Sequence, residues 1–169
     1  MIAPYEKDLR NTPHGPTEDL RIELTGLARD AGLFAPQVPE RWGGIGLDHV
    51  NMAIGCKACG LSPLGPIAMH CAAPDEGNMN LFDKVASEAQ KQRWLKPFAA
   101  GDFRSCVSMT EPLSAGSHPS KMKTTARYDG DEFVVNGGKW LITGAKGAGF
   151  TTIFCDVEPD GDKPGGPTC

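Results

Sequence analysis

The stretch "AAGDFRSCVSMTEP", residues 99–112, is where this 169-residue chain changes its pattern of apolar residues. Upstream of it, apolar residues recur every three or four positions, which is the period of an α-helix. Downstream of it they alternate with polar residues, which is the period of a β-strand. The change falls near residue 102. We therefore predict an α+β protein, with an N-terminal helical domain at residues 1–101 and an incomplete, antiparallel β-barrel-like domain at residues 102–169.

The first helix is predicted to begin after Thr17, because a threonine hydroxyl is a good cap for the first helical N–H groups. Glu18 and Asp19 place negative charge in the first turn, where the helix dipole favours it. Gly32 provides a stop, since glycine readily adopts the left-handed conformation that ends many helices. The apolar stripe expected to face the core comprises Leu20, Leu24, Leu27, Ala28 and Ala31.

Further helices are predicted from similar signals. Asp48 is a second cap, ahead of a helix at residues 49–59. A third helical region covers residues 66–85 and is interrupted near Pro74. The capping box at residues 87–90 opens a last helix. The side chains expected to point inward from the second and last helices are Val50, Ala53, Ile54, Ala58, Trp94, Leu95 and Phe98.

The second half of the chain is predicted to form an antiparallel meander. Asp129-Gly130 is interpreted as one turn, and Asn136-Gly137 as a type I′ hairpin turn, because both central residues of that turn need a positive φ. The expected strands are residues 103–109, 121–128, 132–136, 139–143 and 150–157. The last eleven residues, "PDGDKPGGPTC", show no signal for an element. The sheet therefore has open edges, and the sequence looks as though it ends within a domain.

Composition excludes several classes of partner. Apolar residues make up 40% and charged residues 22% of the chain, which is ordinary for a globular protein with a core. The net charge of −4 and the absence of a basic block argue against nucleic acid or an anionic membrane as a partner. No apolar run reaches the ~18 residues of a membrane span. Without a targeting signal we expect a cytoplasmic protein, or a mitochondrial or peroxisomal one in a eukaryote.

Six cysteines raise the question of a disulfide framework or a metal site. They show no dense spacing, and the only C-x-x-C motif, "GCKACG", is followed by the adjacent pair His70-Cys71 rather than by a second spaced pair. Zinc sites usually repeat a compact ligand pair. We interpret the cysteines as reduced thiols and predict no metal site. They are Cys56, Cys59, Cys71, Cys106, Cys155 and Cys169.

The loop between the first two predicted strands is rich in small and hydroxyl residues. Its hydroxyls are those of Thr110, Ser114, Ser117 and Ser120, and Ala115-Gly116 exposes backbone N–H groups without steric bulk. Such a loop can form an anion-binding concavity for phosphate groups. It can equally be an ordinary turn, and composition alone does not separate the two interpretations.

The order of motifs across this loop resembles the acyl-CoA dehydrogenase family. "SMTEP", "AGSHPS" and "KTTARYDGDEFVVNGGKWLITGA" follow one another as in that family's middle β domain. Upstream, "AGLFAPQVPERWGGIGLD" and "SEAQKQRWLKPFAAGDFRSC" resemble its N-terminal helical domain. The resemblance covers residues 24–157 and is densest over residues 105–145. "TEPLSAGS" and "APDEGNMNLF" resemble the subgroup that acts on longer or unusual acyl chains.

The resemblance implies an FAD cofactor and a set of contacts with it. Val107, Met109 and Thr110 would present donors to the pyrimidine end of the flavin. Ser117 would contact the pyrophosphate and lie near the acyl-CoA. The segment that would lie along the isoalloxazine, with its threonine directed towards N5, comprises Leu141, Ile142 and Thr143.

Strand geometry and two departures from the family bear on this assignment. If residues 139–143 form a strand, alternation places Leu141 and Thr143 on one face and Trp140 and Ile142 on the other. Leu141 stands where the family usually has an aromatic residue. His118 stands where an aspartate is common, and we interpret it as a solvated loop histidine.

The resemblance also implies the reaction. A carboxylate base removes the α-proton of an acyl-CoA thioester while the flavin accepts hydride from the β-carbon, as in fatty-acid β-oxidation. The family's base lies in a C-terminal helical domain, and neither Glu111 nor Glu132 matches its position, so we assign no catalytic residue. We expect this chain alone to be nearly inactive.

The expected partners and alternatives follow from the same resemblance. Acyl-CoA is the substrate, an electron-transfer flavoprotein or similar acceptor takes the electrons, and the full-length protein is a homo-oligomer. One alternative is a non-catalytic fragment that acts only by assembling with a partner chain. Another is a relative of the acyl-CoA oxidase type.

Overall fold

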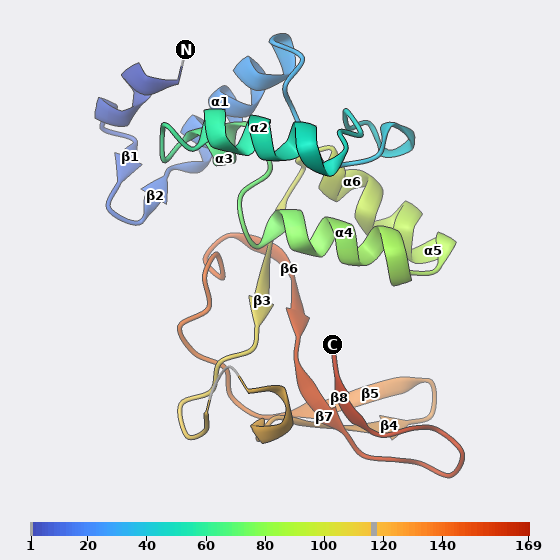
Figure 1. Ribbon diagram of the computed structural model, residues 1–169. Coiled ribbons are helices and arrows are strands. Elements are labelled where there is room, and N and C mark those ends of the chain that lie inside the picture. Colours follow the sequence, from blue (N-terminus) through green and yellow to red (C-terminus); the bar gives the residue numbers. More distant parts are fainter. Residues whose placement is uncertain (1, 116–117) are drawn as a thin grey trace. The chain divides into compact units, whose positions relative to one another are not determined.

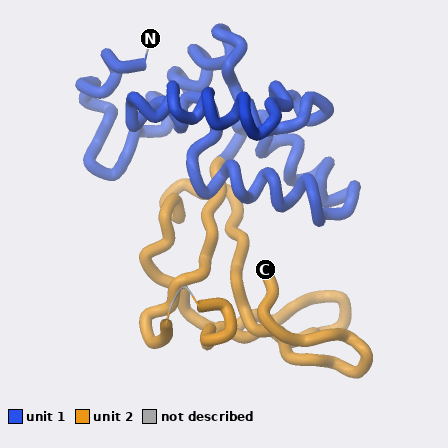
Figure 2. Tube along the Cα trace, viewed as in Figure 1, with its two compact units in different colours: residues 1–103 blue, residues 104–169 orange. Residues whose placement is uncertain are grey.

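The computed structural model describes residues 2–115 and 118–169 and confirms the α+β class (Figure 1). The chain divides into two compact units, Met1–Phe103 and Arg104–Cys169 (Figure 2). All the helices longer than one turn lie in the first unit. The longer strands lie in the second.

The first unit is built from short helical elements. The α-helices of the described chain are α1 (Glu18–Asp30), α2 (His49–Cys59), α3 (Gly65–Ala68), α4 (Asp75–Val85), α5 (Glu88–Gln90) and α6 (Lys96–Ala99). A π-helical segment, η3 (Lys91–Leu95), joins α5 to α6. Short elements complete the unit: the 3-10 helices η1 (Ala3–Lys7) and η2 (Glu40–Trp42), and the strand pair β1 (Asn11–Thr12) and β2 (Gly15–Pro16).

The predicted helix starts are confirmed. The Thr17 hydroxyl accepts a hydrogen bond from the Leu20 N–H at the start of α1. The Asp48 carboxylate accepts one from the Asn51 N–H at the start of α2. Ser87 and Gln90 form both bonds of the capping box that opens α5. Each cap satisfies N–H groups that have no partner within the helix.

The stop of α1 and most of its inward stripe are also confirmed. Gly32 has a φ of +68° directly after the helix. Leu20 and Leu24 are fully buried and Ala28 is nearly so, and the helix packs against α3. Ala31 is exposed, because the stripe reaches the surface at the last turn.

Removing the cap of α1 is expected to destabilise the chain modestly. Thr17→Ala loses the acceptor for the Leu20 N–H, and we expect the free energy of unfolding to fall by about 1 kcal/mol. Thr17→Ser keeps a hydroxyl and should stay within about 0.5 kcal/mol of the wild type. Denaturant unfolding of both variants checks this; equal losses in the two would contradict a capping role.

The inward face predicted for α2 is wrong. Val50, Ala53, Ile54 and Ala58 are all exposed, and no residue of α2 is buried. The C-terminal end of α2 lies tightly against α3: a Cβ added to Gly65 would meet the Cys59 carbonyl oxygen at 2.0 Å. Periodicity identifies an apolar face but not the surface that covers it, and in the described part of this unit the predicted face of α2 stays exposed.

The core of the first unit centres on aromatic side chains. Phe98 is completely buried. Its ring stacks on Phe103 with centroids 5.7 Å apart, and meets the His70 ring edge-on at the same centroid distance. The third predicted helical region appears as α3 and α4, with the predicted interruption between them at Pro74.

The second unit contains two sheets. The strands are β3 (Arg104–Ser108), β4 (Thr125–Asp129), β5 (Glu132–Asn136), β6 (Ala148–Ile153), β7 (Cys155–Val157) and β8 (Gly166–Thr168), and a 3-10 turn, η4 (Pro119–Lys121), precedes β4. β3 and β6 pair in parallel as one sheet. The other sheet has the order β5-β4-β7-β8, in which β4 and β7 are parallel. The described residues form no closed barrel.

The predicted meander is therefore wrong in its connections. The segment 150–157 is extended as expected, but it divides at Phe154 into β6 and β7, which pair in different sheets. β8 lies in the C-terminal residues, where no element is predicted. The turn between β4 and β5 is confirmed, with Gly130 at a φ of +62°.

The prediction of a hairpin turn at Asn136-Gly137 is also wrong, because residues 139–143 form no strand. Gly137 instead lies against Thr124, whose Oγ1 would be only 2.4 Å from a Cβ added to the glycine. The glycine thus permits a close approach of two backbones rather than a tight turn.

None of the helices in residues 2–115 and 118–169 combines the length and apolar character needed to cross a bilayer.

Candidate functional site

Two irregular segments of the second unit are held side by side by a pair of hydrogen bonds. The Trp140 N–H donates to the Thr110 carbonyl oxygen at 3.1 Å. In return, the Thr110 hydroxyl donates to the Trp140 carbonyl oxygen at 2.5 Å. Thr110 follows β3, and Trp140 belongs to the segment that leads to β6. Both segments carry residues predicted to form the cofactor site, so the fold brings these residues together.

Lys139 and Glu111 strengthen this junction. The Lys139 ammonium donates to the Met109 carbonyl oxygen at 3.0 Å and to Glu111 Oε1 at 2.9 Å. Glu111 is buried and also accepts hydrogen bonds from the N–H groups of Lys123 (2.6 Å) and Thr124 (2.8 Å). The Ser114 hydroxyl donates to its second oxygen at 3.0 Å. One carboxylate therefore ties the loop after β3 to the segments before β4 and before β6.

The environment of Glu111 keeps it ionised. Burial raises the pKa of a carboxyl group, but here the hydrogen bonds from Thr124, Lys123 and Lys139 outweigh burial and hold the pKa of Glu111 well below its usual range. All the bonds described are to the chain itself, so the carboxylate has a structural role.

The predicted cofactor residues differ in how the structure places them. Val107 lies in β3, half-buried, and Met109 and Thr110 follow it at the junction. Leu141 is 84% exposed and has a φ of +52°, so the predicted strand alternation of residues 140–143 is wrong. Ile142 is half-buried and Thr143 is exposed. Ser117 lies outside the described residues, and the exposed His118 matches its interpretation as a loop residue.

Backbone donors remain available at the junction. Among the hydrogen bonds found within residues 2–115 and 118–169, Thr110 uses its hydroxyl and carbonyl but not its N–H. The N–H groups of Ile142 and Thr143 likewise have no partner within these residues. The junction therefore presents N–H donors from two segments together with the Thr143 hydroxyl. Such a donor set suits the carbonyl and ring-nitrogen acceptors of a planar heterocycle.

Two polar features of the structure were not predicted from the sequence. One is the Lys139–Glu111 pair, which joins residues 28 positions apart in the sequence. Nothing local distinguishes Lys139 from a solvent-exposed lysine. One of the loop hydroxyls that suggested an anion-binding site is already bonded within the chain, because the Ser114 hydroxyl donates to the Glu111 carboxylate.

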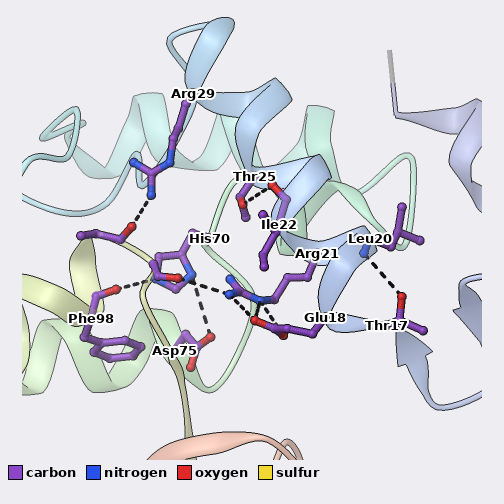
Figure 3. Close-up of polar contacts among 12 residues, drawn as sticks. Thr17, Glu18, Leu20, Arg21, Ile22, Thr25, Arg29, His70, Asp75 and Phe98 are labelled. Atoms are coloured by element: carbon purple, nitrogen blue, oxygen red, sulfur yellow. Dashed lines mark hydrogen bonds and ion pairs between the residues drawn. The ribbon is translucent and has the colours of Figure 1, made fainter.

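The other feature is a buried polar cluster in the first unit (Figure 3). The Arg21 guanidinium, 4% exposed, bonds Glu18 at 2.6 Å and the Gly101 carbonyl oxygen at 3.3 Å. The buried His70 ring contacts the Phe98 carbonyl oxygen through Nε2 at 2.8 Å, with the Asp75 carboxylate 4.0 Å from Nδ1. Burial lowers the pKa of His70, against the raising effects of Phe98 and Asp75. The cluster joins α1, α4 and α6, and the described part of the chain contains no group of ligands arranged for a metal ion.

Comparison with known protein families matches nearly the whole chain. Residues 1–102 match the model described as acyl-CoA dehydrogenase, N-terminal domain. Residues 106–169 match the model described as acyl-CoA dehydrogenase, middle domain. This chain belongs to the acyl-CoA dehydrogenase family. The junction described above falls within the part matched by the acyl-CoA dehydrogenase middle domain.

Individual acyl-CoA dehydrogenases support the same family. A Mycobacterium tuberculosis protein named probable acyl-CoA dehydrogenase FadE2 is 38% identical over 124 residues, which are 73% of this chain and 30% of the relative. A solved Mycobacterium abscessus structure of the family has a TM-score of 0.78 at 33% identity, over 89% of this chain and 39% of that one.

A Bacillus anthracis acyl-CoA dehydrogenase structure, complexed with FAD, has a TM-score of 0.64 at 26% identity, over 92% of this chain and 26% of that one. The chain thus spans less than half the length of each of these three proteins.

Proposed function

We propose that this chain is the N-terminal and partial middle region of an FAD-dependent acyl-CoA dehydrogenase that introduces a double bond between the α- and β-carbons of an acyl-CoA. The observation that carries the proposal is the reciprocal pairing of Thr110 with Trp140. It joins the two motif segments, in which the N–H groups of Thr110, Ile142 and Thr143 have no partner within residues 2–115 and 118–169. The Bacillus anthracis relative complexed with FAD supports the same cofactor.

Specific residues are assigned to FAD under this proposal. The residues that would bind the cofactor are Val107, Met109, Thr110, Ser117, Leu141, Ile142 and Thr143, and Ser117 would also lie near the acyl-CoA. The available N–H of Thr110 suits a carbonyl oxygen of the flavin. The exposed Leu141 side chain supplies an apolar surface but no aromatic stacking.

The chain's own residues account for binding rather than for proton transfer. Bound FAD supplies the acceptor for the hydride that leaves the β-carbon. Removal of the α-proton needs a base within hydrogen-bonding reach of the substrate. Glu111 is occupied by Lys123, Thr124 and Lys139. We therefore infer that the base comes from outside this chain, and that the chain alone has weak flavin affinity and negligible activity.

The wider setting of the enzyme is part of the proposal. The full-length protein would be a homo-oligomeric oxidoreductase of fatty-acid metabolism, with an electron-transfer flavoprotein or a similar protein as electron acceptor. One observation favours the alternative of a non-catalytic fragment that acts only by assembling with a partner chain: Val50 and Ile54 of α2 are 71% and 63% exposed. An apolar face of this kind is typical of a surface that another chain covers.

Titration of FAD into the purified chain tests the cofactor assignment. Thr110→Val removes the hydroxyl that bonds the Trp140 carbonyl oxygen, and we expect FAD affinity, measured by flavin fluorescence, to fall about 3- to 10-fold. Thr12→Val removes a similar hydroxyl-to-carbonyl bond, to Gly15, far from these segments in sequence, and should leave affinity unchanged.

Two outcomes would count against the proposal. One is no FAD binding at any concentration tested, and the other is equal FAD affinity in Thr110→Val and the wild type. Dye reduction by an acyl-CoA with the chain alone would contradict the inference that the base lies elsewhere.

A further inference from the structure

An apolar hollow of about 380 Å³ lies between α1, α2 and α3. α3 packs against both of the other helices, and the residues that line the hollow all belong to the first unit (Figure 1). None of the described lining residues is charged. Pockets that bind small molecules usually measure about 300–1,000 Å³ and are lined mainly by apolar groups. The hollow therefore has the size and the lining of a small-molecule site.

The hollow has a buried floor of small residues and an apolar opening. Ala28 of α1 and Ala68 of α3 both line it and are buried. Leu33 and Leu61, in the segments that follow α1 and α2, also line it but are exposed. Because alanine fills little of the space between two helices, room remains beside the buried pair, and the leucines flank the side that solvent reaches. Exposed apolar side chains around a concave surface are typical of a binding site.

A glycine in the interior of α2 adds to this space. Gly55 lines the hollow, and a Cβ added to it would meet no atom of the described residues within 4 Å. Glycine weakens the interior of a helix relative to alanine, and here no close approach of another described segment requires it. The missing side chain of Gly55 therefore leaves part of the hollow open.

Ser62 supplies the hydroxyl among the described lining residues, and it is only 8% exposed. Its oxygen accepts a hydrogen bond from the Leu64 N–H at 3.3 Å. A serine hydroxyl can also donate one hydrogen bond, but among the bonds found within residues 2–115 and 118–169 this hydroxyl donates none. A buried donor without an acceptor is costly, so an acceptor oxygen on a bound molecule would gain affinity from it.

We propose that this hollow binds a small uncharged molecule with a hydrocarbon body and one acceptor oxygen, such as a ketone or an ester. The apolar walls favour the hydrocarbon part, because binding removes it from water. A carboxylate or an amine is disfavoured, because a charge taken out of water needs a partner and the described lining residues supply none. The Ser62 hydroxyl is the donor for the oxygen. Binding at this site would need neither FAD nor a partner chain.

Acetophenone and ethylbenzene are matched probes for this site, because a carbonyl group in one replaces a methylene group in the other. Saturation-transfer NMR titrations of the 169-residue chain give a Kd for each probe, and we expect both to bind saturably. In Ser62→Ala, acetophenone should lose about 3- to 10-fold in affinity relative to ethylbenzene, since only the ketone uses the hydroxyl. Intermolecular NOEs from either probe to the side chains of Leu27 and Met69, which line the hollow, locate the bound molecule without any substitution.

Gly55→Leu and Gly26→Leu form a matched pair of variants. Both glycines lie inside a helix, and a Cβ added to either meets no atom of the described residues within 4 Å, but Gly55 lines the hollow and Gly26 does not. Gly55→Leu should weaken the binding of both probes by about 10-fold or more, because the leucine occupies the space. Gly26→Leu should bind them as the wild type does. Circular dichroism checks that both variants are folded.

Three results would overturn the proposal. One is no saturable binding of either probe to the wild type, and another is equal binding by Gly55→Leu and Gly26→Leu. The third is an unchanged ratio of the two Kd values in Ser62→Ala, which would show that the site does not recognise an oxygen through this hydroxyl. If a variant does not fold, the wild-type NOEs still decide whether the probes occupy the hollow.

Discussion

Glu111→Gln is expected to lower the free energy of unfolding by about 3–5 kcal/mol. The buried carboxylate accepts hydrogen bonds from two backbone N–H groups and from Lys139, whose side chain is only 11% exposed. Glutamine is nearly the same size but uncharged, so the substitution leaves the Lys139 ammonium largely buried without its counter-charge. Denaturant unfolding of the whole chain measures the loss.

A double-mutant cycle separates the pair from the rest of the site. Lys139→Met alone leaves a buried carboxylate and should also be costly, but the double variant should lose clearly less than the sum of the two single losses. Glu132→Gln, at an exposed position of β5, is the matched control and should change stability by less than about 0.5 kcal/mol. Additive losses across the cycle would show that Glu111 and Lys139 do not stabilise each other.

The lowered pKa of Glu111 predicts how the free energy of unfolding depends on pH. The pKa of Glu111 is lower in the folded chain than its ordinary value near 4.5, so the unfolded chain binds the proton more readily. Its contribution to stability is therefore complete above about pH 4.5 and is lost as the pH falls from there towards the lowered pKa. In Glu111→Gln this part of the fall in the free energy of unfolding at acid pH should be absent. An unchanged slope would mean that other carboxyl groups account for it.

Phe98→Ala is expected to cost about 3–5 kcal/mol, because it leaves a cavity at the centre of the first unit. The Phe98 ring is 0% exposed and lies between Phe103 and His70. Its loss removes the edge-on contact with the buried His70 ring but keeps the hydrogen bond of that ring to the backbone carbonyl of residue 98. We expect denaturant unfolding to show the stability loss and a tryptophan fluorescence spectrum shifted towards that of the unfolded chain.

Two variants calibrate this result. Phe98→Leu fills most of the space and should lose less than half as much stability as Phe98→Ala. Phe133→Ala removes a ring that is 52% exposed and packs only against Tyr128 among the ring contacts of the described residues, so its cost should be under about 1.5 kcal/mol. If Phe98→Ala and Phe133→Ala were equally costly, Phe98 would not be the centre of the core.

Helix caps and the turn after β4 were predicted well, because they depend only on residues that are neighbours in the sequence. The Thr17 cap bonds an N–H three residues away, as the Asp48 cap does. The turn at Gly130 needs only the φ that glycine allows. The apolar stripe of α1 was correct at Leu20 and Leu24, which are fully buried, whereas the same reasoning failed on α2, whose predicted inward residues Val50 and Ile54 are exposed.

The candidate site was predicted in part. The motif segments around Thr110 and Trp140 were identified from family resemblance, and the structure brings them together. The reason they meet was not visible, because it lies in Lys139 and Glu111, two charged residues that sequence analysis gave no joint role. Leu141 was expected on a strand face but has a positive φ in an irregular segment, so its orientation could not follow from alternation.

The sequence by itself determined the family, the helical-then-stranded order of the chain, the helix caps and the turn between β4 and β5. Only the tertiary structure decided that β3 pairs in parallel with β6, that residues 150–157 divide between two sheets, and that Thr110 meets Trp140 across 30 positions. The physical reason is one of range. A cap or turn is satisfied within a few residues, whereas strand pairing and buried charges depend on which distant group supplies the missing hydrogen bond.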